Sequence, residues 1–311
     1  MTNPLDDRLL ALTAIVTVAF QLSFFLITYA LRFDKVTDFA GTTNFLLLAV
    51  ITLTVGGAYK PRQIVLSTCV FVWGVRLCAF LLYRILLWGE DRRFDDKRNN
   101  VARLAAFWIL QAVWVWTVSL PITIVNSKEV SKPLNALDYV GWGIFALAAL
   151  LEAVADQQKL NFKNTPQSRG RWTDVGVWKW SRHPNFFAEM TVWWGLFLSS
   201  INDLRGAEFA AIASPIFITL LLLFVSGIPI LEKSWDEKYG RKDGYAEWKN
   251  MTSVLIPIPP SLYVGIPKSI KSTLLLDFKM YNPGPKPDVD QAITKKPTEE
   301  TSLVEEAKHT A

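Results

Sequence analysis

Residues 178–195 read WKWSRHPNFFAEMTVWWG, and positions 182–189 bring together a cation, an imidazole, a proline, an amide and a carboxylate. A polar segment gives way to an apolar one at this point. Because the first amides of a helix have no partner inside it, proline is tolerated there, so Pro184 predicts the start of a helix. The start of a helix attracts anions, and we expect backbone amides and Arg182 to receive one here.

The composition places this stretch in a membrane protein. Of 311 residues, 51% are hydrophobic and 13 are Trp, and the mean hydropathy is positive. Soluble domains rarely have such a composition. Several apolar runs reach the length of about 20 helical residues that crosses a hydrocarbon core. The net charge of +5 is modest and gives no reason to expect a nucleic-acid partner.

We therefore predict an all-α, polytopic membrane protein of about seven transmembrane helices. The predicted spans are Leu9 to Leu31, Asn44 to Tyr59, Ile64 to Leu87, Leu104 to Val125, Leu137 to Ala155, Phe186 to Ile201 and Phe209 to Leu231. The first run is too long for a signal-peptide core and lacks a basic segment before it, so we interpret it as a span and not as a cleaved signal.

Basic residues predict the orientation. They gather in three segments, at 92–103, 159–182 and 233–249, whereas the intervening loops carry few. Under the positive-inside rule these three segments face the cytosol, the N-terminus lies on the far side and the C-terminus is cytosolic. The expected compartment is the endoplasmic reticulum in a eukaryotic host, or the inner membrane in a bacterium.

Three regions are predicted along the chain. Residues 1–65 form N-terminal transmembrane helices, residues 66–262 form a membrane catalytic domain, and residues 263–311 form a cytosolic, largely disordered tail. The prolines at 257, 259 and 260 cannot continue a helix and mark the end of the second region. From about Asn282 the chain is polar and has few apolar side chains to bury.

The first group of polar residues lies at the end of the third run. Arg76 is deep in apolar sequence, where an unpaired charge costs about 3 kcal/mol, so we expect an ion pair or a wet cavity around it. For Arg84, Arg92 and Arg93, anchoring at the membrane interface and a role in a site are equally good interpretations.

The second group lies at the end of the fifth run. Glu152, Asp156 and Lys159 follow i, i+4 and i+7 spacing and therefore share one helix face. This pattern predicts either one site or a salt-bridged stripe. A solvated helix end would explain Lys159 and Lys163 but not Glu152, which lies in otherwise apolar sequence.

Two more groups lie on the same predicted side of the membrane. Arg171 and Trp172 precede the segment 178–195. A cation beside an aromatic ring suits either the recognition of a phosphate or a belt of aromatic and basic residues at the lipid headgroups. The amphipathic segment 231–248, which carries Glu232 and Tyr245, either lies in the interface or folds back as a lid over the other groups.

The sequence offers no recognisable metal motif. It has no His-Glu-x-x-His pattern, and Cys69 and Cys78, within one apolar run, are expected to be small buried hydrophobes. It also lacks a glycine-rich dinucleotide fingerprint and a phosphate-binding P-loop. A nucleotide would therefore bind in a pocket between helix ends.

Several motifs between Trp73 and Pro260 occur in a fixed order. They are Trp88-Gly89-Glu90-Asp91-Arg92-Arg93, Asp156-Gln157-Gln158-Lys159, Arg182-His183-Pro184-Asn185-Phe186-Phe187-Ala188-Glu189, Trp193-Trp194-Gly195, Glu232, Tyr245-Ala246-Glu247-Trp248 and residues 252–257. Together they resemble the C-terminal domain of the steroid 5-alpha-reductase family, and in particular its uncharacterised branch. Arg-His-Pro also occurs in isoprenylcysteine carboxyl methyltransferases and phospholipid methyltransferases, which are similar at a greater distance.

The resemblance implies an enzyme that holds NADPH in a cytosol-facing cavity and reduces a carbon–carbon double bond of a lipidic, steroid-like or enone substrate. The residues for which it implies or allows a role in cofactor binding are Arg84, Arg92, Asp156, Lys159, Lys163, Arg171, Arg182, His183, Asn185, Glu189, Glu232 and Tyr245. The candidates for the catalytic positions on early spans are Tyr83 and Glu90. Ala188 departs from the family, which usually has Gly there.

The implied reaction requires a proton donor. Hydride attack on the far carbon of an enone places negative charge on the carbonyl oxygen, which a Tyr hydroxyl or a protonated carboxyl in a dry pocket stabilises. Arginines and lysines would bind the phosphates of the cofactor.

Two other functions remain open. One is an S-adenosylmethionine-dependent methyltransferase of a lipid or an isoprenylcysteine-type carboxylate. The other is a lipid-binding scaffold without chemistry, since fold does not determine function. Asp156, Lys159 and the Glu90-Asp91-Arg92 loop favour the reductase, because a methyltransferase needs fewer cations. The expected partners are the bilayer and a lipophilic small molecule.

Overall fold

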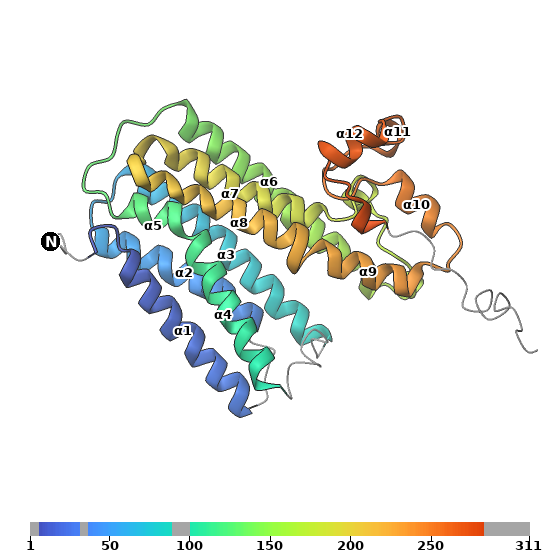
Figure 1. Ribbon diagram of the computed structural model, residues 1–311, viewed down its shortest axis with the longest axis horizontal. Helices are drawn as coiled ribbons and strands as arrows, with labels where there is room; N and C mark the ends of the chain where they lie inside the picture. The colour runs from blue at the N-terminus through green and yellow to red at the C-terminus, as the bar shows by residue number, and fades with distance from the viewer. Residues whose placement is uncertain (1–5, 32–36, 89–99, 283–311) are drawn as a thin grey trace, which may run out of the picture.

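The computed structural model describes residues 6–31, 37–88 and 100–282, which form a bundle of helices running between two ends (Figure 1). Its main helices are α1 (Leu10–Leu31), α2 (Thr37–Gly56), α3 (Pro61–Trp88), α4 (Val101–Val118), α5 (Leu120–Asn126), α6 (Ala136–Asn164), α7 (Pro184–Ser200), α8 (Ala213–Leu220) and α9 (Ile228–Tyr239). Shorter helices follow: α10 (Tyr245–Met251), α11 (Pro260–Tyr263) and α12 (Lys268–Thr273). The all-α prediction is confirmed, and Pro184 is the first residue of α7.

Within the described residues, six segments are long and apolar enough to cross a membrane, where seven were predicted for the chain. They are α1, α2, α3, α4, α6 and the stretch Gly206–Tyr239, which contains α8 and α9. The remaining predicted span is α7, whose 17 residues rise about 26 Å, short of the roughly 30 Å of a hydrocarbon core. It lies between α6 and α8 within the bundle (Figure 1).

The predicted span from Leu104 to Val125 is wrong as a single helix. It is divided into α4 and α5 at Ser119, because Pro121, at the start of α5, lacks an amide hydrogen to continue the ladder. Two other helices differ from their predicted spans. Helix α2 begins at Thr37, earlier than predicted, and α6 continues beyond its predicted end to Asn164. The predicted boundary at residues 65/66 falls inside α3.

Helix α1 has its polar side chains inside and its apolar side chains outside. Thr13, Thr17 and Gln21 are buried against the bundle, whereas Ile15 and Leu22 are more than half exposed. Gln21 donates from Nε2 to Oδ1 of Asn44 on α2 at 3.0 Å. A hydrogen bond between helices is the expected use of polar side chains in a bilayer, where lipid tails solvate the apolar surface.

Helices α6 and α7 pack closely against each other at two glycines. A Cβ atom on Gly141 would lie 2.6 Å from the carbonyl oxygen of Gly195, and one on Gly195 would lie 2.8 Å from that of Gly141. Only glycine permits this approach, which brings acidic residues of α6 near those of α7.

The chain after α9 returns to the segment 178–195. Ser181 and Ser253 form a parallel β-bridge, and the amides of Arg182 and His183 donate to the carbonyls of Ser253 and Val254 at 2.8 and 3.1 Å. Of the predicted tail 263–311, residues 263–282 are described, and they carry α12 and a 3₁₀ turn that ends at Tyr281.

We call the end of the bundle where α3 and α6 terminate and α7 begins the basic end, because the described parts of the predicted cytosolic segments lie there. The opposite end holds the α5–α6 connection and the end of α7 (Figure 1).

Candidate functional site

A cavity of about 370 Å³ lies among the helices towards the basic end. It is lined by residues from α2, α3, α4, α6, α7 and the segment from α8 to α9. The apolar part of the lining consists of Leu77, Phe80, Leu81, Phe107, Leu110, Trp114, Phe186, Ile218, Leu221 and Leu222, and the polar part of Asp38, Thr42, Arg84, Gln111, Glu152, Asp156, Asn185, Glu189 and Ser226. Such a volume and such a mixed lining are typical of a small-molecule site.

Arg76 joins α3 to the acidic face of α6. Its Nη1 lies 2.7 Å from Oδ2 of Asp156, and its Nη2 contacts Oε1 of Glu152. The ion pair expected for Arg76 from the sequence is thus present. Glu152 and Asp156 share a face as predicted, and one guanidinium binds both because they are one helical turn apart.

Glu189 is held by two indoles. Nε1 of Trp73 donates to its Oε2 at 3.2 Å, and Nε1 of Trp193 donates to its Oε1 at 3.0 Å. Both donors are neutral. They fix the orientation of this carboxyl group and add no positive charge to the site.

Asp38 and Arg84 form an ion pair on the lining, with Nη2 2.9 Å from Oδ2. Their side chains are 25% and 28% exposed, so the pair is reached by solvent. In all, the described lining holds four carboxyl groups and one guanidinium, that of Arg84. A second guanidinium, that of Arg76, forms ion pairs with two of these carboxyl groups. The described part of the cavity therefore has an excess of negative groups.

Two buried acceptors on the lining lack a donor among the described residues. They are Oε2 of Glu152 and Oε1 of Gln111, on side chains of residues that are 3% and 6% exposed. A buried acceptor without a donor costs about 1–3 kcal/mol, so these atoms mark where a ligand can bind.

A second polar cluster lies beside the cavity, around Glu232 of α9. This carboxylate accepts from Nη1 of Arg182 at 2.9 Å, lies 2.9 Å from Nζ of Lys249 and contacts Nε2 of His183 at 2.7 Å. Arg182 also donates to Oδ1 of Asn282. The charge of Arg182 is therefore already matched within the protein.

His183 is stacked between Phe186 and Trp235, with ring centroids 5.6 and 5.1 Å away. Burial lowers the pKa of His183 below its usual range, although Glu232 opposes this shift. A neutral imidazole beside a carboxylate must carry its proton on Nε2. Nδ1 then has no partner within the described residues.

One cavity wall is a π-helical segment, Leu221–Val225, between α8 and α9. Leu221 and Leu222 line the cavity, and the hydroxyl of the fully buried Tyr281 donates to the carbonyl of Leu223 at 2.6 Å. Single π turns leave backbone groups unpaired and are frequent at functional sites. The last described turn of the chain therefore fixes this wall.

The predicted site residues divide into several places. Arg84, Asp156, Asn185 and Glu189 line the cavity. Arg182, His183 and Glu232 form the neighbouring cluster, and the hydroxyl of Tyr245 donates to Asp236 there. The segment 231–248 thus folds back onto the segment 178–195, which is one of the two arrangements predicted for it.

The other predicted residues lie away from the cavity. Lys159 is over the rings of Trp178 and Trp235, Lys163 donates to the carbonyl of Arg171, and the side chain of Arg171 is 57% exposed beside Asp174. Tyr83 is 54% exposed and is not part of the described lining. Glu90 and Arg92 lie outside the described residues.

The polar residues of the site that were not among the predicted site residues include Asp38, Arg76, Gln111 and Glu152. Two of them carried a signal, because a charge deep in an apolar run was noted for Arg76 and Glu152. Gln111 carried none, since a lone amide in a span is usually a helix–helix contact. In the described part of the chain, no group of three or more His, Cys, Asp or Glu side chains is arranged to hold a metal ion.

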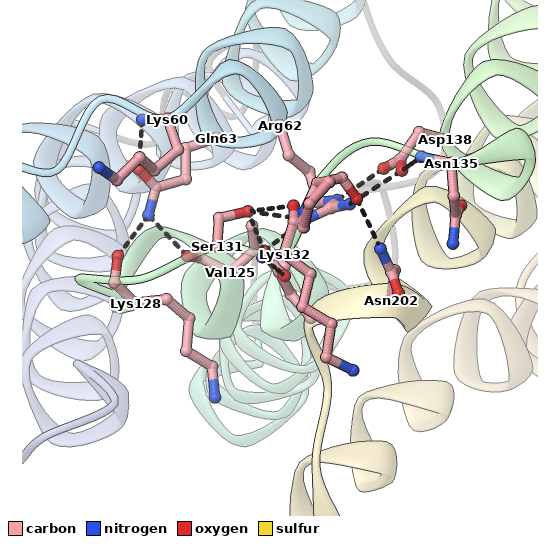
Figure 2. A network of polar contacts seen from close by, with 12 residues as sticks. Lys60, Arg62, Gln63, Val125, Lys128, Ser131, Lys132, Asn135, Asp138 and Asn202 are labelled. Carbon is pink, nitrogen blue, oxygen red and sulfur yellow. Dashed lines mark hydrogen bonds and ion pairs between the residues drawn. The ribbon is translucent and has the colours of Figure 1, made fainter.

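The opposite end of the bundle has its own buried cluster, shown in Figure 2. Arg62 donates from Nε and Nη2 to both oxygens of Asp138, at 2.6 and 2.8 Å, and its Nη1 lies 2.7 Å from Asp203. Ser131 and Lys132 complete the shell of Asp203. Because these groups are mutually satisfied, the cluster ties α3, α6 and the end of α7 together.

Comparison with known proteins places the chain in a family. The family described as "Protein of unknown function (DUF1295)" matches residues 24–252, and the chain belongs to it. This match covers most of the region, Trp73 to Pro260, that resembles steroid 5-alpha-reductases. That finer assignment stays a prediction.

Two relatives are similar over part of the chain. An uncharacterized protein of Schizosaccharomyces pombe is 27% identical over 212 residues, covering 57% of this chain and 59% of its own. The probable O-methyltransferase ustE of Ustilaginoidea virens is 28% identical over 141 residues, covering 45% of each chain. The chain thus spans between 45% and 59% of the length of these relatives. No solved structure matches it.

Proposed function

We propose that this protein is a membrane-embedded methyltransferase that uses S-adenosylmethionine and a lipophilic acceptor. The observation that carries the proposal is the negative excess of the cavity, with four carboxyl groups on its described lining. S-adenosylmethionine has a sulfonium cation at its reactive centre, and carboxylates stabilise such a cation in a site of low dielectric. The relative named as a probable O-methyltransferase supports the same class of reaction.

The partly exposed part of the cavity lining suits the amino-acid end of S-adenosylmethionine. Its methionine part is a zwitterion, which needs one anion and one cation. Asp38 and Arg84 present both signs as a partly exposed pair, and Asn185 adds an amide. Aromatic side chains such as Phe80 and Phe186 offer surfaces against which the adenine ring would stack.

NADPH fits the described part of the cavity less well, because it is polyanionic. Both guanidiniums near the lining already bind carboxylates, and Arg182 is matched by Glu232. A phosphate would have to displace these partners. The favourable observation for the reductase is that Asn185 and Glu189 both line the cavity, as the resemblance implies. Reduction of a lipidic double bond is therefore the second candidate function.

Ligand binding to the full-length protein in detergent tests both candidates. S-adenosylmethionine and NADPH are titrated separately in a calorimeter. We expect saturable binding of S-adenosylmethionine, weakened about tenfold by Asp156→Asn because a charged partner is lost. Glu247→Gln, on the exposed side of α10, is the matched control and should bind normally.

Each opposite outcome has a meaning. Binding of NADPH without binding of S-adenosylmethionine would overturn the methyltransferase in favour of the reductase. Binding of neither would leave the scaffold function.

A further inference from the structure

The cavity also carries information about the molecule that would be modified. We propose that the acceptor is a lipophilic alcohol or phenol, and that Oε2 of Glu152 takes the proton that its hydroxyl loses on methylation. The methyl-transfer step rests on the proposed function. The choice of a hydroxyl over a carboxylate or an amine rests on the unpartnered polar atoms of the cavity.

Glu152 presents one free oxygen to the cavity. Its Oε1 contacts Arg76, and its Oε2 has no donor within residues 6–31, 37–88 and 100–282. The residue is 3% exposed. A buried carboxylate with one oxygen fixed by a guanidinium and the other free is placed to accept a proton from a bound ligand.

Helix α4 presents a free acceptor and a free donor to the same cavity. Nε2 of Gln111 donates to the carbonyl of Thr37 at 3.0 Å, which leaves Oε1 without a described donor. One turn along, Nε1 of Trp114 is a buried donor without a described acceptor. A hydroxyl group has one hydrogen to donate and lone pairs that accept, so it suits a free acceptor such as Oε2 of Glu152 together with the free donor of Trp114.

The other headgroups fit this arrangement less well. A carboxylate brings no hydrogen to Glu152 or Gln111, and it adds a negative charge beside Asp156 and Glu189. An ammonium group satisfies the carboxylates but cannot accept from Trp114. The hydroxyl is the headgroup that donates to Glu152 and accepts from Trp114 without adding a charge to the cavity.

The rest of the lining suits an apolar body. Leu77, Phe80 and Leu81 of α3 line the cavity together with Phe107 and Leu110 of α4, and Leu110 is 40% exposed. In a bilayer that exposed surface meets lipid tails. The acceptor would therefore be a molecule that partitions into the membrane and presents its hydroxyl to α6.

The chemical step is balanced as follows. The acceptor oxygen forms a bond to the methyl carbon while the carbon–sulfur bond breaks, and the sulfonium becomes a neutral thioether. The hydroxyl proton passes to Oε2 of Glu152, which later releases it to solvent. No oxidant or reductant is needed.

Headgroup preference is measurable without any turnover. The full-length protein is incubated with 1-hexadecanol, hexadecylamine or palmitate, which share one chain length, and its melting temperature is recorded. We expect the largest rise with hexadecanol. Glu152→Gln should remove this preference, and Trp114→Phe, which removes the donor but leaves Glu152 in place, should reduce it. Glu247→Gln should keep it.

Turnover gives an independent readout. With labelled S-adenosylmethionine and hexadecanol, wild-type protein should form the methyl ether. Glu152→Gln should be slower by about 10²–10⁴-fold, the usual range for a lost general base, whereas its affinity for S-adenosylmethionine should fall only about tenfold, as for the loss of another carboxylate of the lining. If Glu152 had only a structural role, its replacement would not lower the rate so much more than the affinity for S-adenosylmethionine.

Several results would overturn the proposal. They are a larger or equal temperature rise with palmitate or hexadecylamine, no rise with any of the three, a preference that survives in Glu152→Gln, or undiminished transfer by that variant. If hexadecanol is preferred through Glu152 but S-adenosylmethionine does not bind, the headgroup selectivity stands and the methyltransferase falls.

Discussion

Arg76 of α3 and Asp156 of α6, 80 positions apart in the chain, form a 2.7 Å ion pair beside the cavity. The same guanidinium also contacts Glu152. This arginine therefore holds two carboxylates of one helix face against a second helix. It stabilises the fold and sets the charge of the site at once.

Replacement of Arg76 by Met should destabilise the protein. Two buried carboxylates would lose their cation, and removing one partner of a buried ion pair costs about 3–5 kcal/mol; the 24% exposure of the Arg76 side chain places the loss at the lower end. The melting temperature in detergent should fall by several degrees. Arg169→Met, at an exposed arginine, is the control and should melt as the wild type does. Equal melting of both variants would contradict the role of Arg76.

The contact between α6 and α7 predicts opposite effects for two glycines of the bundle. Gly195→Ala would place a Cβ atom 2.8 Å from the carbonyl of Gly141, and such overpacking costs about 1–3 kcal/mol. Gly143→Ala, on α6, meets no described atom within 4 Å and should be neutral or stabilising by up to about 1 kcal/mol. Thermal unfolding of both variants measures the difference, and the same sign for both would contradict the packing.

Arg62 should be required for stability but not for ligand binding. Arg62→Met leaves Asp138 and Asp203 buried without their cation at the end opposite the cavity, so we expect a loss of about 3–5 kcal/mol. The affinity of the protein that remains folded for the ligand of the cavity should be unchanged. Lys60→Met, beside Arg62 in sequence and half-buried, is the comparison. Loss of affinity without loss of stability would contradict the separation of the two ends.

Tyr281→Phe should loosen the cavity wall. The variant loses the 2.6 Å hydrogen bond to Leu223 but keeps the ring, so its stability should drop by only about 1 kcal/mol. Hydrogen exchange of the amides at 221–226 should become faster, because their π-helical geometry is no longer fixed. Tyr139→Phe, at a 61% exposed position, is the control. Unchanged exchange at 221–226 would contradict the coupling.

His183 should make stability depend on pH. Its pKa in the folded protein is lowered by burial, so as pH falls below about 6.5 the unfolded chain binds a proton before the folded protein does. Acidification from pH 7 to 5.5 should therefore lower the melting temperature more in the wild type than in His183→Gln. The chain has one other histidine, His309, which is present in both proteins. Identical pH slopes would contradict the shift.

The class of the fold could be predicted from the sequence because hydrophobic length is a local property. Each run of about 20 apolar residues must form a helix to satisfy its backbone in lipid, whatever its neighbours do. The start of α7 could also be predicted, since the fixed backbone angle of Pro184 suits a first turn. The break at Ser119 was missed because apolar composition does not show where a helix is interrupted.

The site was predicted only in part. Asp156, Asn185 and Glu189 could be identified because they stand in motifs whose order resembles a known family. The sequence also showed that Arg76 needs a partner, but it could not say which one, because a helix pair can pack in several registers. Gln111 joins the site only because α4 lies across the cavity from α6.

The sequence by itself therefore determined that this chain is a helical membrane protein, that Pro184 begins a helix, and that its polar motifs gather at one end. Those properties follow from hydrophobic length, backbone geometry and the distribution of charge. Only the tertiary structure decided which charges remain for a ligand. Arg182 is matched by Glu232, whereas Glu152 keeps one oxygen free, and such pairing depends on distances between helices that no local pattern fixes.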